Sequence, residues 1–237
     1  MVRDGGLSVP NGELHVVDDV CSAFADLVVS QVASGLARAP AQPFSLVLSG
    51  GSTARSCYEL LASRHALDWG RIECLVGDER CVPPDDPEAN QKMIRDALVD
   101  RVEPRPRLIP MDCGAEDAYE KVIAARAHLD LVHLGLGPDG HTASLFPGSG
   151  ALLGPPDRLV VRNVDPSGRN CHPRLTLTLA GIGRARLVVF TVAGEDKHEA
   201  MSRVLGHEDL PATRVHADRV VWLCDREAIG PQSLAVG

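Results

Sequence analysis

The sequence has few aromatic residues: phenylalanine, tryptophan and tyrosine together make up 3% of its 237 residues. A hydrophobic core must therefore be built mainly from valine, leucine, isoleucine and alanine. Runs of lysine or arginine are also missing, and the formal net charge is -8. Because nucleic-acid-binding proteins carry basic surfaces, we expect no nucleic-acid partner. An anionic substrate would need a local basic pocket that works against the overall charge.

Cysteines with the spacing of a metal site or a disulfide framework are absent as well. The seven cysteines are scattered along the chain, and no two of them form a C-x-x-C pair. This pattern argues against a structural zinc site and against paired cysteines. We therefore predict small buried thiols in a reducing, cytoplasmic environment, and no bound metal.

Long apolar runs are also lacking. No stretch approaches the ~18 residues needed to cross a bilayer, and the first ten residues have neither the basic nor the apolar region of a signal peptide. We therefore expect no membrane association. The remaining composition, 44% hydrophobic and 24% charged, is that of an ordinary globular protein. The length fits a single α/β domain over residues 1–237.

Short apolar runs alternate with amphipathic stretches along the whole chain. The runs bounded by glycine, proline or charge predict strands at 14–17, 44–48, 72–76, 131–136, 159–161, 187–192 and 220–224. The amphipathic stretches predict a helix from residue 20, capped by Asp18 or Asp19, and helices at 54–63, 89–99, 116–127 and 196–205. This alternation indicates an α/β fold whose largely parallel sheet is covered by helices on both faces.

The first polar cluster is the Ser-Gly-Gly-Ser-Thr loop at 49–53, between a predicted strand and a predicted helix. Gly50 and Gly51 let the backbone approach a ligand closely, and Ser52 or Thr53 can cap the helix. The N–H groups and dipole of a helix N-terminus favour an anion. The loop lacks the lysine of a Walker A motif and the last glycine of a nucleophile elbow. A phosphate site and an ordinary capped turn both fit this spacing.

The second cluster follows another predicted strand and precedes a proline-rich loop. Ligands of parallel sheets bind at the carboxyl ends of the strands. Arg80 can offer two donors to a phosphate or carboxylate, and Asp78 can accept from sugar hydroxyls or orient a neighbour. We assign these two residues to the candidate site and predict that Glu79, Asp85 and Asp86 belong to a solvated loop.

The third cluster is a glycine-rich turn that contains Asp139 and His141. Its glycines satisfy G-x-G-x-x-G, but Pro147 follows too soon for the long helix that a dinucleotide site requires. Histidine titrates near neutrality and can take a proton from water, and a nearby carboxylate can fix its tautomer. A capping aspartate beside a surface histidine would also fit. We predict His141 as the general base and Asp139 as its partner.

Lys197 lies in the first turn of the helix predicted at 196–205, shortly after Gly194. A cation is unfavourable at this end of a helix dipole. Contact with a bound anion would explain its position, although a solvated surface lysine would as well.

Taken in order, these segments resemble the 6-phosphogluconolactonase family. Five segments between residues 48 and 197 carry the resemblance, and their order makes it specific where each alone is weak. They are Leu48-Ser-Gly-Gly-Ser-Thr53, Gly77-Asp-Glu-Arg-Cys-Val-Pro-Pro-Asp-Asp-Pro87 with Asn90 and Met93, Asp139-Gly-His-Thr-Ala-Ser-Leu-Phe-Pro-Gly148, Arg174-Leu-Thr-Leu-Thr178 and Gly194-Glu-Asp-Lys197. The sequence departs from the family pattern at Ala54, where proline is frequent, and in the Cys-His-Pro run before Arg174.

The resemblance implies a single α/β domain with a Rossmann-like sheet. It also implies hydrolysis of 6-phospho-D-glucono-1,5-lactone to 6-phosphogluconate in the pentose phosphate pathway, without a metal or organic cofactor. By motif match, His141 is similar to the family's proposed base, Arg80 and Lys197 to its substrate-anion contacts, and residues 50–53 to its glycine loop. The implied partner is a small phosphorylated sugar lactone.

Several points stay open at this stage. The sequence does not say whether Arg162, Arg169 or Arg174 contacts the phosphate, nor whether the protein is a monomer or a small homo-oligomer.

Two alternative functions share part of this pattern. A deaminase resembling glucosamine-6-phosphate deaminase would share the glycine loop and the Asp-Gly-His turn. That family has an acid one residue before Pro-Gly, whereas this chain has Phe146, which cannot relay a proton. A non-catalytic sugar-phosphate sensor would need a DNA-binding module, and the strand predicted at 14–17 leaves no room for one before it.

Overall fold

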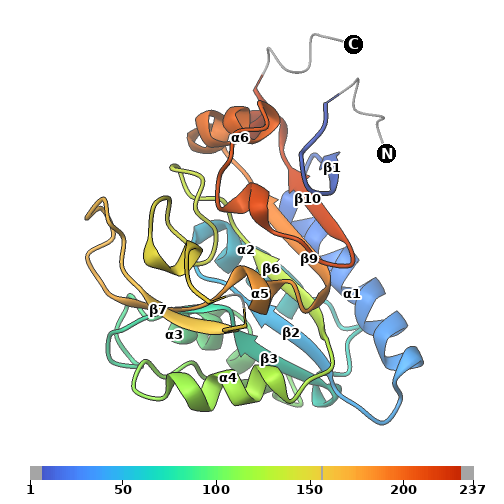
Figure 1. Ribbon diagram of the computed structural model, residues 1–237. Helices are drawn as coiled ribbons and strands as arrows, with labels where there is room; N and C mark the ends of the chain where they lie inside the picture. The colour runs from blue at the N-terminus through green and yellow to red at the C-terminus, as the bar shows by residue number, and fades with distance from the viewer. Residues whose placement is uncertain (1–6, 156, 231–237) are drawn as a thin grey trace.

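A computed structural model describes residues 7–155 and 157–230, and its main feature is a seven-stranded parallel sheet (Figure 1). The strand order is β1-β10-β9-β6-β2-β3-β5, and a smaller antiparallel sheet has the order β4-β8-β7. The strands are β1 (Glu13–Val16), β2 (Phe44–Leu48), β3 (Ile72–Val76), β4 (Asp78–Arg80), β5 (Arg107–Ile109), β6 (Leu129–Leu134), β7 (Val160–Asn163), β8 (Arg174–Leu177), β9 (Ala185–Val192) and β10 (Val220–Cys224). The helices are α1 (Val20–Arg38), α2 (Ser52–Ala62), α3 (Asn90–Ala97), α4 (Glu116–Ala124), α5 (Leu179–Ile182), α6 (His198–Leu205) and α7 (Arg226–Ile229).

The predicted α/β class is confirmed: helices flank the parallel sheet (Figure 1). The predicted strands at 44–48, 72–76 and 220–224 coincide with β2, β3 and β10. The strand predicted at 131–136 instead spans 129–134, because Gly135 already belongs to the turn that follows. The two ends of the predicted 1–237 domain, residues 1–6 and 231–237, lie outside the described residues.

Three strands were not predicted, namely β4, β5 and β8. β4 is three residues long and consists of Asp-Glu-Arg, so it carries no apolar periodicity that could reveal it. Pairing imposes its extended conformation, since Arg80 lies opposite Arg174 and Asp78 opposite Thr176 in the antiparallel ladder with β8. Glu79, predicted in a loop, therefore lies in a strand, whereas Asp85 and Asp86 lie in the loop after it as predicted.

α1 begins where the sequence indicates, because the Asp19 carboxylate accepts a hydrogen bond from the Ser22 N–H at 3.0 Å. Its buried face includes Phe24, Val28 and Val32, which pack against the sheet and α2. By length and composition, α1 is also the one described helix that could cross a membrane, contrary to the expectation that no such stretch exists. The burial of this face is the pattern of a core helix.

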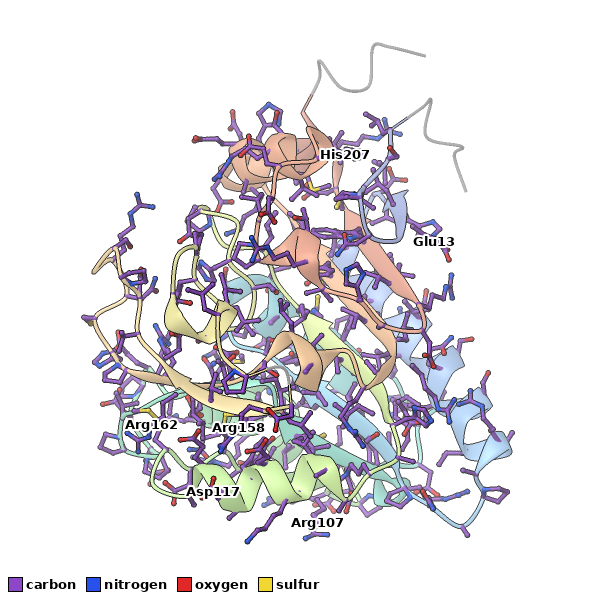
Figure 2. All side chains as sticks on the ribbon, in the orientation of Figure 1. Glu13, Arg107, Asp117, Arg158, Arg162 and His207 are labelled. Carbon is purple, nitrogen blue, oxygen red and sulfur yellow. A yellow bond between two sulfur atoms is a disulfide. The ribbon has the colours of Figure 1, made fainter. Side chains whose placement is uncertain are left out.

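Ion pairs fasten the small sheet to α4. Arg158, which precedes β7, lies 2.8 Å from Glu120 and 3.0 Å from Glu116, both on α4. Figure 2 shows Arg158 and Asp117 close together where β7 passes α4, and their charged atoms are 3.3 Å apart. These contacts hold one edge of the small sheet against the body of the protein.

The cysteine prediction was wrong for one pair. Cys81 and Cys113 form a disulfide with an S–S distance of 2.02 Å. The two residues are 32 positions apart, so no local spacing pattern could reveal the pairing. Disulfides are rare in reducing compartments, and the cysteines therefore no longer support a cytoplasmic location.

We expect reduction of this disulfide to destabilise the fold. Closing a loop of this length restricts the unfolded chain, and its loss should lower the free energy of unfolding by about 3–4 kcal/mol. Urea denaturation of wild type and of the double variant Cys81→Ser/Cys113→Ser measures the change, with Cys171→Ser, an exposed thiol, as control. Seven titratable thiols in the denatured, unreduced wild type would contradict the pairing.

Candidate functional site

The strand order places the candidate site at the boundary between β2 and β6. From β2 the chain proceeds outward to β3 and β5, and it then returns to the other side of β2 as β6. Ligands of open parallel sheets bind at such a switch point, beyond the carboxyl ends of the strands. The glycine loop follows β2 and the Asp139–His141 turn follows β6, so topology alone makes these two segments neighbours.

A pocket of about 270 Å³ lies at this edge of the sheet. Most predicted site residues line it, and Asp139 lies directly behind it through its contact with His141. The predicted lining residues are Gly50, Gly51, Ser52, Thr53, Asp78, Arg80, His141 and Lys197. Ser144, Asn170 and Thr191, which the sequence did not single out, also line it. So do Asn90 and Arg174, which the sequence analysis named without assigning them to the site.

The glycine loop leaves the start of α2 open toward the pocket. Gly51 is the N-cap with φ 110°, a conformation that favours glycine, and no side chain caps the helix. The predicted capping role of Ser52 or Thr53 is therefore wrong, because the helix already begins at Ser52. At Gly50 a Cβ would lie 2.1 Å from the Asn90 Oδ1 atom, so only glycine fits there. The first N–H groups of α2 can therefore serve an anion.

Three side chains beneath the loop form a buried chain of hydrogen bonds. Tyr58 of α2 donates its O–H to the Ser49 carbonyl and accepts the Ser49 N–H, at 3.1 and 2.9 Å. Its oxygen is 2.7 Å from Nδ1 of His133, whose Nε2 is 2.8 Å from the Thr191 hydroxyl. Burial lowers the pKa of His133 to about 3 and raises the pKa of Tyr58 well above its usual value. Both side chains are therefore neutral at ordinary pH.

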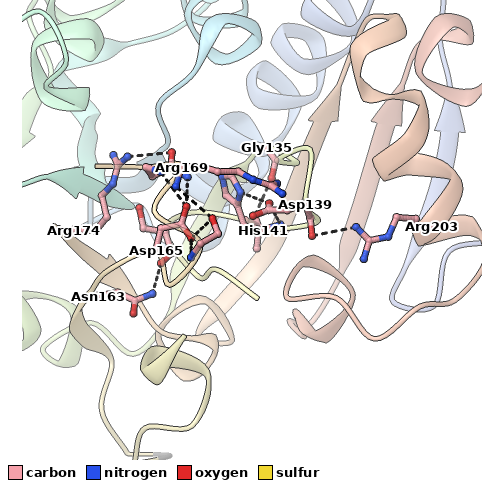
Figure 3. Close-up of polar contacts among 12 residues, drawn as sticks. Gly135, Asp139, His141, Asn163, Asp165, Arg169, Arg174 and Arg203 are labelled. Carbon is pink, nitrogen blue, oxygen red and sulfur yellow. Dashed lines mark hydrogen bonds and ion pairs between the residues drawn. The ribbon is translucent and has the colours of Figure 1, made fainter. Parts of the chain in front are cut away.

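His141 and Asp139 form a pair in the turn after β6 (Figure 3). Nδ1 of His141 lies 2.5 Å from a carboxylate oxygen of Asp139, which also accepts the His141 backbone N–H at 3.1 Å. Burial tends to raise the pKa of Asp139, but its hydrogen bond with His141 prevails and lowers it. A carboxylate only accepts, so Nδ1 carries a proton and Nε2 has a free lone pair when the ring is neutral.

The backbone of this turn is shaped around the histidine ring. At Gly137 a Cβ would lie 2.1 Å from ring atoms of His141, so only glycine is compatible with the ring position. Gly140 has φ 84°, and Ala143, which lines the pocket, has φ 46°. A non-glycine residue in this region is strained, and such strain concentrates at functional sites.

Asp78 lines the pocket as the sequence predicts, whereas Glu79 is not in the solvated loop predicted for it. Asp78 is buried and accepts the Ser144 hydroxyl at 2.6 Å, so it faces the pocket as expected. Glu79 was predicted to be solvated, but it is 1% exposed. Its carboxylate accepts three backbone N–H groups, from Arg80, Asn90 and Gln91, at 2.7 to 2.8 Å. Burial raises the pKa of Glu79. The side chain therefore joins β4 to the start of α3.

Two arginines face each other across the small sheet. Arg80 donates to the Glu88 carbonyl at 2.8 Å, and its partner in the ladder, Arg174, is 5% exposed. Within the described residues, Arg174 makes no ion pair within 4.0 Å, and its Nε has no hydrogen-bond partner. The Arg174 guanidinium donates a hydrogen bond to Asn170 Oδ1 at 3.4 Å (Figure 3). Burial lowers the pKa of Arg174, so a bound anion would relieve its desolvation.

The remaining cations divide between pocket and surface. Lys197 lines the pocket, with Nζ 3.4 Å from the exposed carboxylate of Asp196. Arg162 is exposed beside α4, and Arg169 is exposed on the loop before β8. Of the three arginines that the sequence left open, Arg174 is the one that lines the pocket. Arg174 is brought to the pocket by its antiparallel pairing with Arg80, and no local pattern in the sequence reveals that pairing.

In the part of the chain that the structure describes, no group of three or more His, Cys, Asp or Glu residues could hold a metal ion. The pocket instead combines a histidine–aspartate pair, three basic side chains and an open helix N-terminus. The fold and this site together define an α/β protein with a site for a small anionic ligand.

Comparison with known proteins is consistent with that class. The family model described as glucosamine-6-phosphate isomerases/6-phosphogluconolactonase matches residues 16–222, and the chain belongs to this family. A 6-phosphogluconolactonase from Synechocystis is 40% identical over 204 residues, covering 78% of this chain and 82% of that protein. The Mycobacterium tuberculosis 6-phosphogluconolactonase is 36% identical over 206 residues, covering 77% and 83%. The crystal structure of the Thermotoga maritima 6-phosphogluconolactonase superposes with a TM-score of 0.73 at 30% identity, covering 90% and 99%.

The burial of neutral His133 predicts a pH dependence of stability. The folded state keeps this ring unprotonated down to about pH 3, whereas the unfolded chain binds a proton below about pH 6.5. The unfolded state therefore binds more protons between these values, and stability falls as the pH falls. Between pH 7.5 and pH 5.0, wild type should lose about 2 kcal/mol more than His133→Leu. Urea denaturation at both pH values measures this, and equal losses would contradict it.

Proposed function

We propose that this protein hydrolyses 6-phospho-D-glucono-1,5-lactone to 6-phosphogluconate, as the second step of the pentose phosphate pathway. The observation that carries the proposal is the position of His141. Its ring lines the same pocket as Arg80, Arg174 and Lys197, while its Nδ1 is engaged by Asp139. A base and a set of cations in one pocket suit a substrate with a reactive carbonyl and an anionic group. The relatives named above are 6-phosphogluconolactonases, which supports this choice of substrate.

The phosphate of the substrate occupies the basic side of the pocket. The N–H groups at the start of α2, in the loop 50–53, offer hydrogen bonds to its oxygens. Arg174 and Arg80 supply forked donors, and Lys197 adds a third charge. Because the overall charge of the chain is -8, this local concentration of cations determines where the anion binds.

The lactone carbonyl lies on the side of His141. Nε2 of His141 removes a proton from water while the water oxygen attacks C1, and Asp139 stabilises the imidazolium that forms. The negative charge of the tetrahedral intermediate is held by donors in the pocket. When the intermediate collapses, the bond between C1 and the ring oxygen breaks and that oxygen takes the proton back. The product is a carboxylic acid with a free C5 hydroxyl.

Phe146 favours this reaction over an isomerase or deaminase reaction. Its ring is 1% exposed, lines the pocket and lies 5.0 Å from the His141 ring between centroids. A phenyl group cannot take or give a proton, so His141 has no second acid there with which to open a sugar ring. Hydrolysis of a lactone needs only one base.

The proposal includes the setting in which the reaction takes place. Residues 1–237 form one lactonase-like domain that acts, as a monomer or a small homo-oligomer, on a small phosphorylated sugar lactone. Its chemistry requires no metal or organic cofactor, since water, base and anion contacts suffice for lactone hydrolysis.

The test is the loss of freshly generated 6-phosphogluconolactone against its spontaneous background. Wild type should accelerate it, and His141→Ala should lose about 10²- to 10⁴-fold of that acceleration, the usual contribution of a general base. His128→Ala, which changes an exposed histidine before β6, should retain full activity.

Two results would contradict the proposal. If wild type does not exceed the background, the lactonase function is wrong, and ammonia release from glucosamine 6-phosphate would point to the deaminase reaction. If His141→Ala stays within twofold of wild type, the reaction stands but His141 is not its base.

A further inference from the structure

We propose that His133 and Tyr58 position the anion-binding loop, and that the pair acts on substrate binding rather than on the chemical step. Neither side chain lines the pocket. The kinetic test of this inference rests on the proposed function, whereas the amide-exchange test rests only on the geometry of the loop. His133 is 0% exposed, so it cannot serve as a base itself.

The contacts show how the pair acts on the loop. Tyr58 bonds to both the N–H and the carbonyl of Ser49, the last residue before Gly50. The Ser49 hydroxyl in turn donates to the His133 carbonyl at 2.7 Å. Three hydrogen bonds at Ser49 therefore set the position of the loop, two of them to α2 and one to β6.

His133 extends this link across the sheet. β6 lies between β2 and β9 in the strand order. Nδ1 of His133 meets the Tyr58 hydroxyl on the β2 side, and Nε2 meets the Thr191 hydroxyl of β9 at 2.8 Å. Thr191 lines the pocket. One imidazole thus connects two walls of the pocket, and Phe24 packs on its face with the ring centroids 4.2 Å apart.

The side chains of Tyr58, His133 and Thr191 are uncharged, and this limits what they can contribute to binding and catalysis. Neutral partners neither attract the anion nor transfer a proton at working pH, so their contribution is geometric. The loop binds a phosphate remote from the reacting carbonyl, in the ground state and the transition state alike. Loss of such uniform binding raises KM and leaves kcat unchanged.

The two ring nitrogens can be tested separately. Asparagine places a polar atom near the position of Nδ1, and glutamine places one near that of Nε2. His133→Leu removes both contacts, His133→Asn retains the one toward Tyr58, and His133→Gln retains the one toward Thr191. Because Tyr58 holds the loop directly, asparagine should rescue it and glutamine should not.

The experiment measures KM and kcat for the lactone, together with deuterium exchange of the amides of residues 49–53. His133→Gln, which loses one hydrogen bond, should raise KM about fivefold. Tyr58→Phe and His133→Leu lose more than one and should raise KM at least as much, with kcat within twofold in all three variants. The loop amides should exchange faster in these variants. His133→Asn should resemble wild type in both readouts.

The matched control is Ser45→Ala. Ser45 is buried on β2, at the end of the strand away from the glycine loop. Its hydroxyl hydrogen-bonds to Asp130 and not to any residue of the His133–Tyr58 network. Its loss should leave KM and loop exchange unchanged. A partly unfolded sample would lower the apparent kcat at constant KM, so a purely structural role is distinguishable.

Unchanged deuterium exchange of the loop amides in Tyr58→Phe and His133→Leu would overturn the positioning role. Equal KM and equal amide exchange in His133→Asn and His133→Gln would also overturn it. A fall in kcat at constant KM in these variants would also overturn it. If wild type shows no lactone turnover, the proposed function fails, while the exchange of the loop amides still decides the positioning role.

Discussion

The buried charge of Arg174 is the constraint on which the rest of the site depends. The residue is 5% exposed, lies opposite a second arginine in the β4–β8 ladder, and makes no ion pair within 4.0 Å among the described residues. The charges of Asp78 and Glu79 favour its charged form, but burial prevails and lowers the pKa of Arg174. A buried charge that is only partly compensated is costly. The cost is acceptable where an anion binds, and the open N-terminus of α2 and Lys197 lie on the same pocket.

Glycine and buried acids make this arrangement possible. Gly50 and Gly137 occupy positions where any Cβ would meet Asn90 or the His141 ring. Glu79 is buried without a basic partner at hydrogen-bonding distance, yet three backbone N–H groups satisfy its carboxylate. It thereby fixes β4, which carries Arg80, against the start of α3, which carries Asn90. The segments that line the pocket are thus hydrogen-bonded to one another as well as to the sheet.

The sequence predicted the parts of the fold that local pattern determines. Strands such as β2 and β10 are short apolar runs, and α1 has a capping aspartate and an apolar stripe, so composition and period suffice. The glycine loop, Asp78, Arg80, His141 and Lys197 follow predicted strands, and all of them line the pocket. The rule that ligands bind beyond the carboxyl ends of parallel strands was therefore enough to select them.

The remaining features depend on contacts distant in sequence. β4 is a strand only because β8 pairs with it, and that pairing brings Arg174 to Arg80 across more than ninety residues. Glu79 looks like a loop acid until the start of α3 covers it. The Cys81–Cys113 disulfide and the His133–Tyr58 contact likewise join separate elements. Periodicity and composition contain no information about such pairs.

The most direct test of this account is the affinity for 6-phosphogluconate, measured by isothermal titration calorimetry on wild type and Arg174→Met. If the buried guanidinium binds the phosphate, the variant should bind about 10- to 100-fold more weakly, the usual loss for a charged hydrogen-bonded contact. Arg162→Met, which changes an exposed arginine outside the pocket, should bind as wild type does. Equal affinity of Arg174→Met and wild type would contradict the account, because the buried charge would then have no role in holding the ligand.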